Sequence, residues 1–382
     1  MKQITCLLSI CLAVGSVIAQ PRPADSSRRL LVVSGGGARG AWGAGVISSL
    51  VQREGGYQAV FGTSTGSLMA PLILLGDMDL LDTAYTHVNQ NSIFNKSPFH
   101  VDSSNGTVKT SLNFRAVWRF IFGYKTFGVT KNLFKTIQSF LTQPRYDSLI
   151  NLYRQRGKMM AVAVTNTRTG ALKIIYDSIF HPGITTDYDT LCRWIWASAD
   201  EPLYMSYVSM RDTAYVDGGV REVIPIQDGL QYAITHDIDT VDVVINNSLV
   251  PIDQDWNYKD GGILYGLERL LGIYDLGIVQ YNENYASLLL TYYNAVGNVP
   301  PPGPAPAEAG PHELLYINFY CMPPDLAATY QNELGFVQSA MHTLLLAGKQ
   351  YGADPSQNCF TTVMKKSFLR SVRRPMPGRP NP

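Results

Sequence analysis

Residues 57–75 read YQAVFGTSTGSLMAPLILL and contain a serine, Ser64, with a glycine two residues to each side. An apolar, strand-like run precedes this serine, and a helix-like run follows it from residue 67 to residue 75. A G-x-S-x-G sequence between a strand and a helix is typical of a nucleophile elbow, a turn so sharp that larger flanking residues would collide with backbone. The positive end of the following helix would favour negative charge at the serine hydroxyl. Glycine and serine are common, so this motif alone does not exclude an ordinary strand-to-helix turn.

A second glycine-rich turn lies ahead of this serine. Residues 30–33 (LLVV) predict a buried parallel strand, residues 34–40 read SGGGARG, and a helical stretch of small residues follows. The spacing of the glycines also fits a dinucleotide-binding loop, but that fold requires an acidic residue at the end of the second strand, where this chain has the Ser64 turn. The stretch therefore favours another use, in which backbone N–H groups at a helix N-terminus stabilise an oxyanion beside Ser64.

The alternation of strands, turns and helices predicts an α/β fold with three layers. Further buried strands are expected at residues 159–164, 171–176, 240–246 and 314–320, and a helix at residues 188–198. A carboxylate, Asp217, ends another strand-like segment and precedes two glycines. Asp-Gly-Gly taken alone is a common turn, so Asp217 gains meaning only together with the two earlier motifs.

The three stretches, in this order, resemble the patatin-like phospholipase family. Residues 165–170 (TNTRTG), 197–202 (ASADEP), 217–225 (DGGVREVIP) and 334–336 (LGF) are also similar to that family, so the resemblance covers about residues 30–355. Ser34, where many members have aspartate, and the proline-rich residues 299–311 depart from the family pattern. These departures bear on the substrate rather than on the reacting groups.

The resemblance implies a three-layer α/β/α sandwich with a mostly parallel central sheet and a serine–aspartate dyad that requires no histidine. Ser64 would be the nucleophile and Asp217 the general base. The oxyanion hole would be formed by the loop that comprises Gly35, Gly36, Gly37, Ala38, Arg39 and Gly40, and Arg39 is expected to brace this loop. The resemblance implies no metal and no organic cofactor. The implied substrate is a phospholipid or other lipid ester, cleaved by a phospholipase A or lysophospholipase reaction.

Three other interpretations remain open. His236, His312 and His342 follow Asp217 in the chain order of an α/β-hydrolase triad. His312 lies in a proline-rich stretch, His342 lies within a helical stretch, and His236 reads as a helix cap, so the dyad is the better fit. The second alternative is a catalytically silent lipid- or protein-binding protein, and the third is a nucleotide-binding protein.

Composition and the termini predict the domain organisation. The 382 residues carry a formal net charge of +1, which gives no support for a nucleic-acid partner. Residues 1–19 have a lysine, an apolar run and a small residue at the end, the pattern of a secretory signal peptide. We expect a polar linker at 20–29, a catalytic domain at 30–355 and a basic, proline-rich, disordered tail at 356–382. The protein is expected to be exported to the periplasm, the cell envelope or the medium.

Residues 77–150 read as mainly helical and rich in aromatic residues, and they are expected to shape the substrate pocket. Within them, apolar residues between 114 and 127 alternate with Arg115, Arg119 and Lys125. One interpretation is an amphipathic segment that contacts lipid at a membrane surface. The favoured interpretation is a helix that packs its apolar side on the core and turns its basic residues outward. Peripheral membrane contact is therefore a hypothesis, and the oligomeric state is not predicted.

Overall fold

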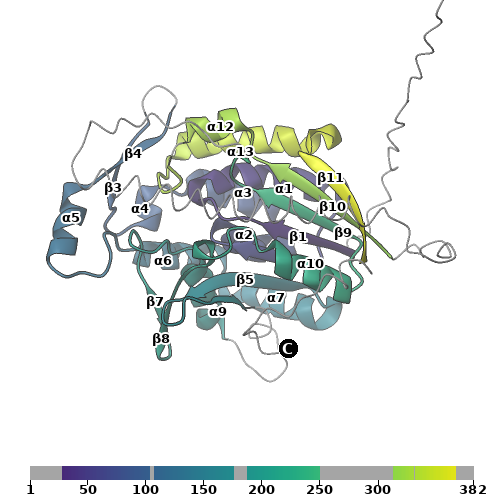
Figure 1. Ribbon diagram of the computed structural model, residues 1–382, viewed down its shortest axis with the longest axis horizontal. Helices are drawn as coiled ribbons and strands as arrows, with labels where there is room; N and C mark the ends of the chain where they lie inside the picture. Colours follow the sequence, from purple (N-terminus) through teal and green to yellow (C-terminus); the bar gives the residue numbers. More distant parts are fainter. Residues whose placement is uncertain (1–27, 104–106, 176–186, 250–312, 331, 367–382) are drawn as a thin grey trace, which may run out of the picture.

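The computed structural model describes residues 28–103, 107–175, 187–249, 313–330 and 332–366 (Figure 1). The expected signal peptide and the proline-rich stretch lie outside the described residues, as do the helices that the sequence indicates within residues 261–295. Among the described residues, no helix is long and apolar enough to cross a membrane.

A nine-stranded sheet forms the centre of the described fold, in the order β11-β10-β9-β1-β2-β5-β8-β7, with β6 paired to β5. Its parallel strands are β1 (Arg29–Val33), β2 (Ala59–Thr63), β5 (Met159–Asn166), β9 (Thr240–Ile245) and β10 (Leu314–Cys321). The antiparallel strands at its two ends are β6 (Leu172–Ile175), β7 (Val208–Met210), β8 (Thr213–Asp217) and β11 (Phe360–Lys365). Every residue of β1 and β2 is buried, as expected for apolar strands covered on both faces.

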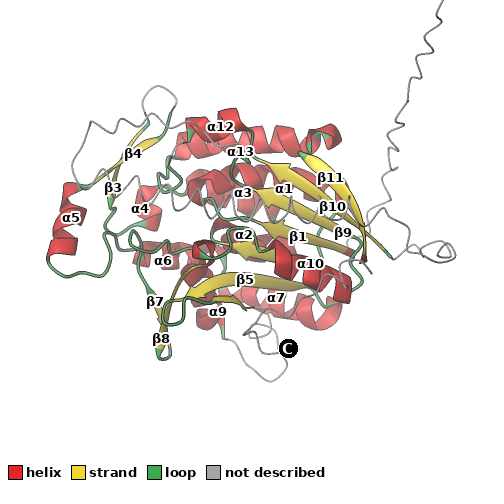
Figure 2. Ribbon diagram, in the orientation of Figure 1, coloured by secondary structure: helices red, strands yellow, loops and turns green. Residues whose placement is uncertain are grey.

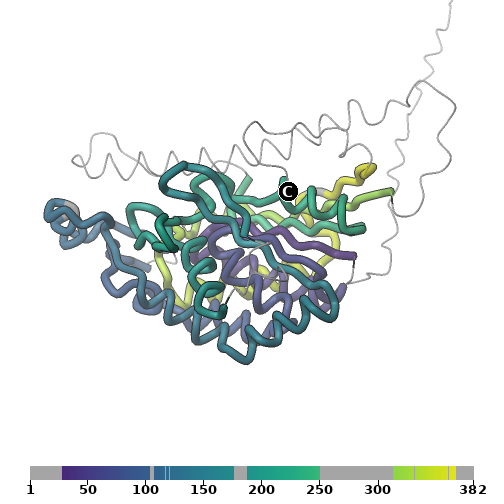
Figure 3. Tube along the Cα trace, turned by 90° about the horizontal axis from the view of Figure 1, so that it is seen from below, coloured from purple at the N-terminus to yellow at the C-terminus, as the bar shows by residue number. Residues whose placement is uncertain are grey.

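Helices surround this sheet (Figures 1 and 3). On one face, α10 (Ile226–Thr235) packs against β1, β2 and β9. Elsewhere α1 (Gly40–Glu54), α3 (Met78–His87) and α13 (Gln338–Ala353) pack together, and α2 (Thr65–Leu75) contacts β2, β5, α7 (Gln143–Arg156) and α9 (Tyr188–Ser198). A Cβ atom on Gly348 would lie 2.0 Å from the Trp42 carbonyl oxygen, so glycine permits the close contact of α13 with α1. The predicted fold class, a mostly parallel sheet with helices around it, is confirmed.

Residues 77–150 contain more than the helices that the sequence indicates. Besides α3, α7, α4 (Gln90–Ile93) and α6 (Lys131–Phe140), a hairpin of β3 (Phe99–Asp102) and β4 (Lys109–Leu112) leads into α5 (Phe114–Ile121) at one end of the molecule (Figure 2). The hairpin was not predicted because each of its strands has only four residues and these residues are mostly polar. Residues 114–127 were expected to pack their apolar side chains on the core. This expectation is right for Phe127, which is 5% exposed, but wrong for Phe114 and Phe122, which are 67% and 72% exposed.

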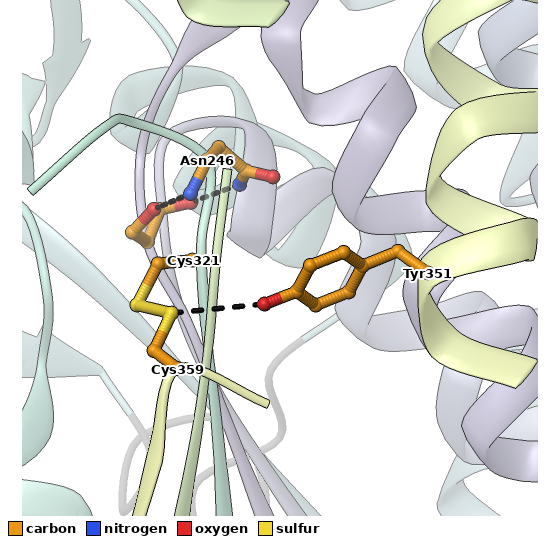
Figure 4. The surroundings of a disulfide bond; sticks show 5 residues. Asn246, Cys321, Tyr351 and Cys359 are labelled. Carbon is orange, nitrogen blue, oxygen red and sulfur yellow. Dashed lines mark hydrogen bonds between the residues drawn. A yellow bond between two sulfur atoms is a disulfide. The ribbon is translucent and has the colours of Figure 1, made fainter. Parts of the chain in front are cut away.

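The predicted tail boundary is also wrong, because residues 360–365 form the edge strand β11, antiparallel to β10. A disulfide joins Cys321 at the end of β10 to Cys359 ahead of β11, and the Tyr351 hydroxyl lies 3.8 Å from the Cys359 sulfur (Figure 4). Lys366 is 2% exposed and donates to the Asp239 carboxylate at 3.0 Å. The basic, proline-rich residues that follow made the whole segment resemble a tail, but the folded domain extends to Lys366.

This boundary predicts the effect of truncation. A chain that ends at Pro355 loses β11 and the buried Met364, and it exposes the edge of β10. We expect its free energy of unfolding to be lower by more than about 2 kcal/mol, the contribution of one buried methionine, than that of a chain that ends at Lys366. Urea denaturation of the two truncated chains measures the difference. Equal stability would place the domain boundary before β11.

Candidate active site

Ser64 lies in the strained turn that its motif predicts. It follows β2 and precedes α2, with φ 53° and ψ −121°. A Cβ atom on Gly62 would lie 2.4 Å from the carbonyl carbon of Gly66, and one on Gly66 would lie 2.4 Å from the Val33 carbonyl oxygen. Gly62 is therefore required by a close contact within the turn, and Gly66 by a close contact with β1, because a side chain at either position would collide with backbone.

Ser198 holds this turn from the side of β5. The Ser64 amide donates to the Ser198 hydroxyl at 3.1 Å, and that hydroxyl donates to the Ala163 carbonyl oxygen at 2.6 Å. Ser198 belongs to residues 197–202 (ASADEP), but the sequence did not indicate a role for it. The pattern could not reveal this bond, because it joins residues 134 positions apart.

The strand register brings Asp217 to the same level as Ser64. Thr63 of β2 pairs with Ala163 of β5, and the next residue of β5, Val164, pairs with Asp217 of β8. The backbones of Ser64 and Asp217 therefore lie on opposite sides of β5 at the same level of the sheet. They are separated by two strand spacings, or about 10 Å. Two residues separated by 153 positions in the sequence therefore reach one site because both adjoin the same strand.

The backbone around Asp217 orients its carboxylate. Asp217 is 2% exposed, and its Oδ1 accepts a hydrogen bond from the Gly219 amide at 2.7 Å. Its own amide donates to the Asp200 carbonyl oxygen at 3.0 Å. A Cβ atom on Gly218 would lie 2.5 Å from the Ala163 carbonyl oxygen, so the first glycine of Asp-Gly-Gly allows β5 to approach closely. The second glycine supplies the amide that holds the carboxylate.

A second carboxyl group, that of Asp200, lies fully buried beside Asp217. Burial raises its pKa well above the usual range, and the negative charge of Asp217 adds to this effect, while a hydrogen bond from the Thr130 hydroxyl opposes it. The neutral form of Asp200 is therefore favoured. A neutral Asp200 avoids a second negative charge next to Asp217.

The glycine loop presents fewer free amides than the sequence suggests. Two of its amides bind distant carbonyl oxygens: the Gly35 amide donates to Val223, and the Ala38 amide donates to Glu333. Two others bind carbonyl oxygens of the loop itself: the Arg39 amide donates to Gly36, and the Gly40 amide donates to Ala38 and Gly37. Within the described part of the chain, the amides of Gly36 and Gly37 have no such partner. These two residues have φ values of 140° and 49°, which favour glycine. The predicted oxyanion loop of residues 35–40 is thus corrected to two available donors.

Residues distant in sequence brace this loop. Arg39 donates through Nε to the Tyr330 carbonyl oxygen at 3.0 Å and through Nη1 to the Asn247 side chain. The half-buried carboxyl group of Glu333 interacts electrostatically with Arg39, while burial raises the pKa of Glu333. Arg39 therefore has the bracing role that the sequence suggested.

Ser34 and Asn246 fix the start of the loop. The Asn246 amide donates to the Ser34 hydroxyl at 2.8 Å, and its Nδ2 donates to the Ser34 carbonyl oxygen at 3.0 Å. Figure 4 shows Asn246 close to the Cys321–Cys359 disulfide. Ser34, the departure from the family pattern, thus serves to tie the loop to the residue that follows β9.

An apolar cavity opens at Ser64. It contains about 970 Å³ of empty space, its open mouth included, and Ser64, Asp217 and Gly37 line it together. Its apolar walls come from α2, α3 and α6, and they include Leu68, Leu72, Leu81, Tyr85, Leu133 and Ile137. The expectation that residues 77–150 shape the pocket is right for α3 and α6, while α2, α9 and α13 complete it.

The cavity wall predicts a change in chain-length preference. Ala84 of α3 lines the cavity, and a leucine there would fill part of it. We expect Ala84→Leu to lower the ratio of long-chain to short-chain ester kcat/KM at least about tenfold, because the extra methylenes displace substrate methylenes worth about 0.8 kcal/mol each. Ala347→Leu on α13, a partly buried position that does not line the cavity, is the matched control. An equal ratio in the two variants would contradict this use of the cavity.

Of the described histidines, none lines the cavity. His236 caps the C-terminus of α10, stacks on Tyr232 at 3.8 Å and is exposed, and His342 is exposed on α13. His312 lies outside the described residues. The described residues also include no group of three or more His, Cys, Asp or Glu that could hold a metal ion.

Comparison with known proteins identifies the family. A family model described as "Patatin-like phospholipase" matches residues 31–230, which is more than half of the 382-residue chain. No curated protein sequence matches. Among solved structures, VipD from Legionella pneumophila is similar, with 15% identity and a TM-score of 0.37 over 58% of this chain and 51% of VipD. The chain thus matches about half of the length of that structure.

The matched region contains the strained Ser64 at the end of β2 and Asp217 on the far side of the neighbouring strand β5. The chain belongs to the patatin-like phospholipase family.

Proposed function

We propose that the protein hydrolyses carboxylic esters of phospholipids with Ser64 as nucleophile and Asp217 as general base. The observation that carries this proposal is that both residues and Gly37 line one apolar cavity. An apolar cavity with a few polar groups at one end suits a lipid acyl chain whose ester carbonyl lies at the polar end. The resulting activity is that of a phospholipase A or lysophospholipase.

The reaction proceeds through an acyl-enzyme. Asp217 accepts the proton of the Ser64 hydroxyl as its oxygen attacks the ester carbonyl, and the Gly36 and Gly37 amides donate to the oxyanion. When the tetrahedral intermediate collapses, the bond to the alcohol breaks, and Asp217 returns the proton to the leaving alkoxide. Water then attacks the acyl-enzyme and gives its proton to Asp217. As the second intermediate collapses, the bond between the acyl carbon and the Ser64 oxygen breaks, Asp217 returns this proton to that oxygen, and the fatty acid is released.

The dyad is favoured over a triad by the positions of the histidines. A histidine base requires hydrogen-bond reach of the nucleophile, and His236 and His342 are exposed residues that do not line the cavity. Asp217, in contrast, lines the cavity together with Ser64. A catalytically silent lipid-binding protein would have no need of a strained serine, an oriented carboxylate and free loop amides together.

Labelling with a fluorophosphonate probe tests the proposal on residues 20–382. We expect labelling of the peptide that contains Ser64, found by mass spectrometry, in wild type and in the His236→Ala, His312→Ala and His342→Ala variants. Loss of labelling in a folded histidine variant would support the triad instead. A folded wild-type chain that is not labelled and releases no fatty acid from phospholipid would support the silent lipid-binding alternative.

We also propose that residues 1–19 direct export and that the mature protein resides in the periplasm, the cell envelope or the medium. The Cys321–Cys359 disulfide supports this proposal, because such bonds persist in oxidising compartments. Fractionation of the source cells and sequencing of the N-terminus are the test, with a mature chain that begins at Gln20 as the expected result. A cytoplasmic protein that retains residue 1 would contradict it.

A further inference from the structure

The described residues include six exposed large apolar side chains, and five of them lie within residues 114–124. These five form what we call the α5 patch, and they are Phe114, Trp118, Ile121, Phe122 and Tyr124, with exposed fractions of 67, 45, 62, 72 and 56%. The sixth, Leu346, lies on α13. Scattered exposed apolar residues are normal, but a cluster of this kind marks an interaction surface.

The aromatic residues of the α5 patch form a row along the helix and its C-terminal end. Phe114, Trp118 and Phe122 are spaced four residues apart, which places them on one helix face. Their rings contact one another, with centroids 6.0 Å apart for Phe114 and Trp118 and 5.8 Å for Trp118 and Phe122. The buried Ala116 lies on a different side of the helix. The row is therefore held in place but left open to an external partner.

The stretch of sequence that contains the α5 patch carries charge of one sign. Residues 103–146 contain seven lysines and arginines and no aspartate or glutamate, and these seven are Lys109, Arg115, Arg119, Lys125, Lys131, Lys135 and Arg145. Arg115 and Lys125 are exposed, and the Arg119 guanidinium lies 4.4 Å from the centre of the Tyr124 ring. Exposed aromatic residues bordered by basic side chains complement the boundary between acyl chains and anionic head groups.

The position of the α5 patch at one end of the molecule suits contact with a lipid surface. The hairpin β3–β4 carries α5 at one end of the molecule, and the next helix, α6, supplies Leu133 and Ile137 to the cavity wall (Figures 1 and 3). α5 has eight residues, too few to cross a membrane, and this length suits a helix that lies in the interface.

We propose that the α5 patch docks the protein on the surface of a bilayer that contains anionic phospholipid. Phe114, Trp118 and Phe122 enter the acyl boundary, and Arg115 and Lys125 contact the head-group phosphates. This inference rests on the proposed function, because docking would serve to bring lipid esters to the cavity for hydrolysis. Binding to a membrane is nevertheless measurable without hydrolysis.

Co-sedimentation with vesicles tests the docking, with the Ser64→Ala chain so that no lipid is consumed. Vesicles of equimolar phosphatidylcholine and phosphatidylglycerol are compared with phosphatidylcholine alone. We expect binding to the mixed vesicles that weakens with salt, and an at least about tenfold loss of that binding in Trp118→Ala/Phe122→Ala and in Arg115→Gln/Lys125→Gln. Leu346→Ala, the exposed apolar residue outside the patch, should bind like the parent chain.

Three results would overturn the proposal: no binding of the parent chain to mixed vesicles, equal binding by the patch variants, or an equal loss in Leu346→Ala. A dimer that dissociates in Trp118→Ala/Phe122→Ala without a change in vesicle binding would also overturn it, because a second copy would then occupy the patch. Hydrolysis of a soluble short-chain ester by the chain with Ser64 intact is the separate measure of the proposed chemistry. Its absence together with vesicle binding would contradict the chemistry alone, and its presence without vesicle binding would contradict the docking alone.

Discussion

Replacement of Ser64 by alanine is expected to lower kcat/KM for a phospholipid or a soluble ester by about 10⁶-fold, the loss typical of a missing serine nucleophile. The reason is that no acyl-enzyme forms without the Ser64 oxygen, while the free loop amides and the cavity remain. The fold should persist, because the bonds that hold the turn use the Ser64 backbone rather than its hydroxyl. Release of fatty acid measures activity, and urea denaturation measures stability.

Ser139→Ala is the matched control for this change. Ser139 lies exposed on α6 and does not line the cavity, so the same loss of a hydroxyl group should leave kcat/KM close to that of wild type. Activity of a folded Ser64→Ala chain above about one per cent of wild type would contradict the nucleophile assignment, since residual catalysis from binding and the oxyanion hole is far smaller. In that case another residue would carry the reaction.

The sequence predicted those parts of the fold whose patterns are local. The apolar runs of β1, β5, β9 and β10 and the helix at residues 188–198 needed no information from elsewhere in the chain. The Ser64 turn was recognisable from its local G-x-S-x-G spacing, although Gly66 avoids a collision with Val33 of β1 rather than with the turn itself. Strand β11 was missed because its pattern is short and the residues after it resemble a tail, so that only pairing with β10 defines it.

The candidate site was predictable in its residue types but not in its contacts. The choice of Gly36 and Gly37 among the loop amides depends on the Val223 and Glu333 carbonyl oxygens, which occupy the Gly35 and Ala38 amides from distant positions. The exposure of the α5 patch was likewise not predictable, because an amphipathic pattern specifies an apolar face without specifying what covers it. Tertiary structure decides whether such a face meets the core or an external surface.

The second large effect is expected for Asp217→Asn, which should lower kcat/KM by about 10³–10⁴-fold because the amide cannot accept the Ser64 proton. Asparagine keeps the size of aspartate, and its Oδ1 can still accept the Gly219 amide, so the site should keep its geometry. Asp200→Asn is the matched comparison, the same change at a neighbouring carboxyl group whose neutral form is favoured.

If Asp217 is the base, the two substitutions must differ. Asparagine at position 200 can still accept the Thr130 hydroxyl, and the backbone bond from Asp217 to the Asp200 carbonyl oxygen is independent of the side chain. We therefore expect Asp200→Asn to lower kcat/KM less than about tenfold, against the 10³–10⁴-fold expected of a lost general base. Similar losses in two equally stable variants would mean that the carboxyl groups act as a unit, and that Asp217 alone does not take the proton.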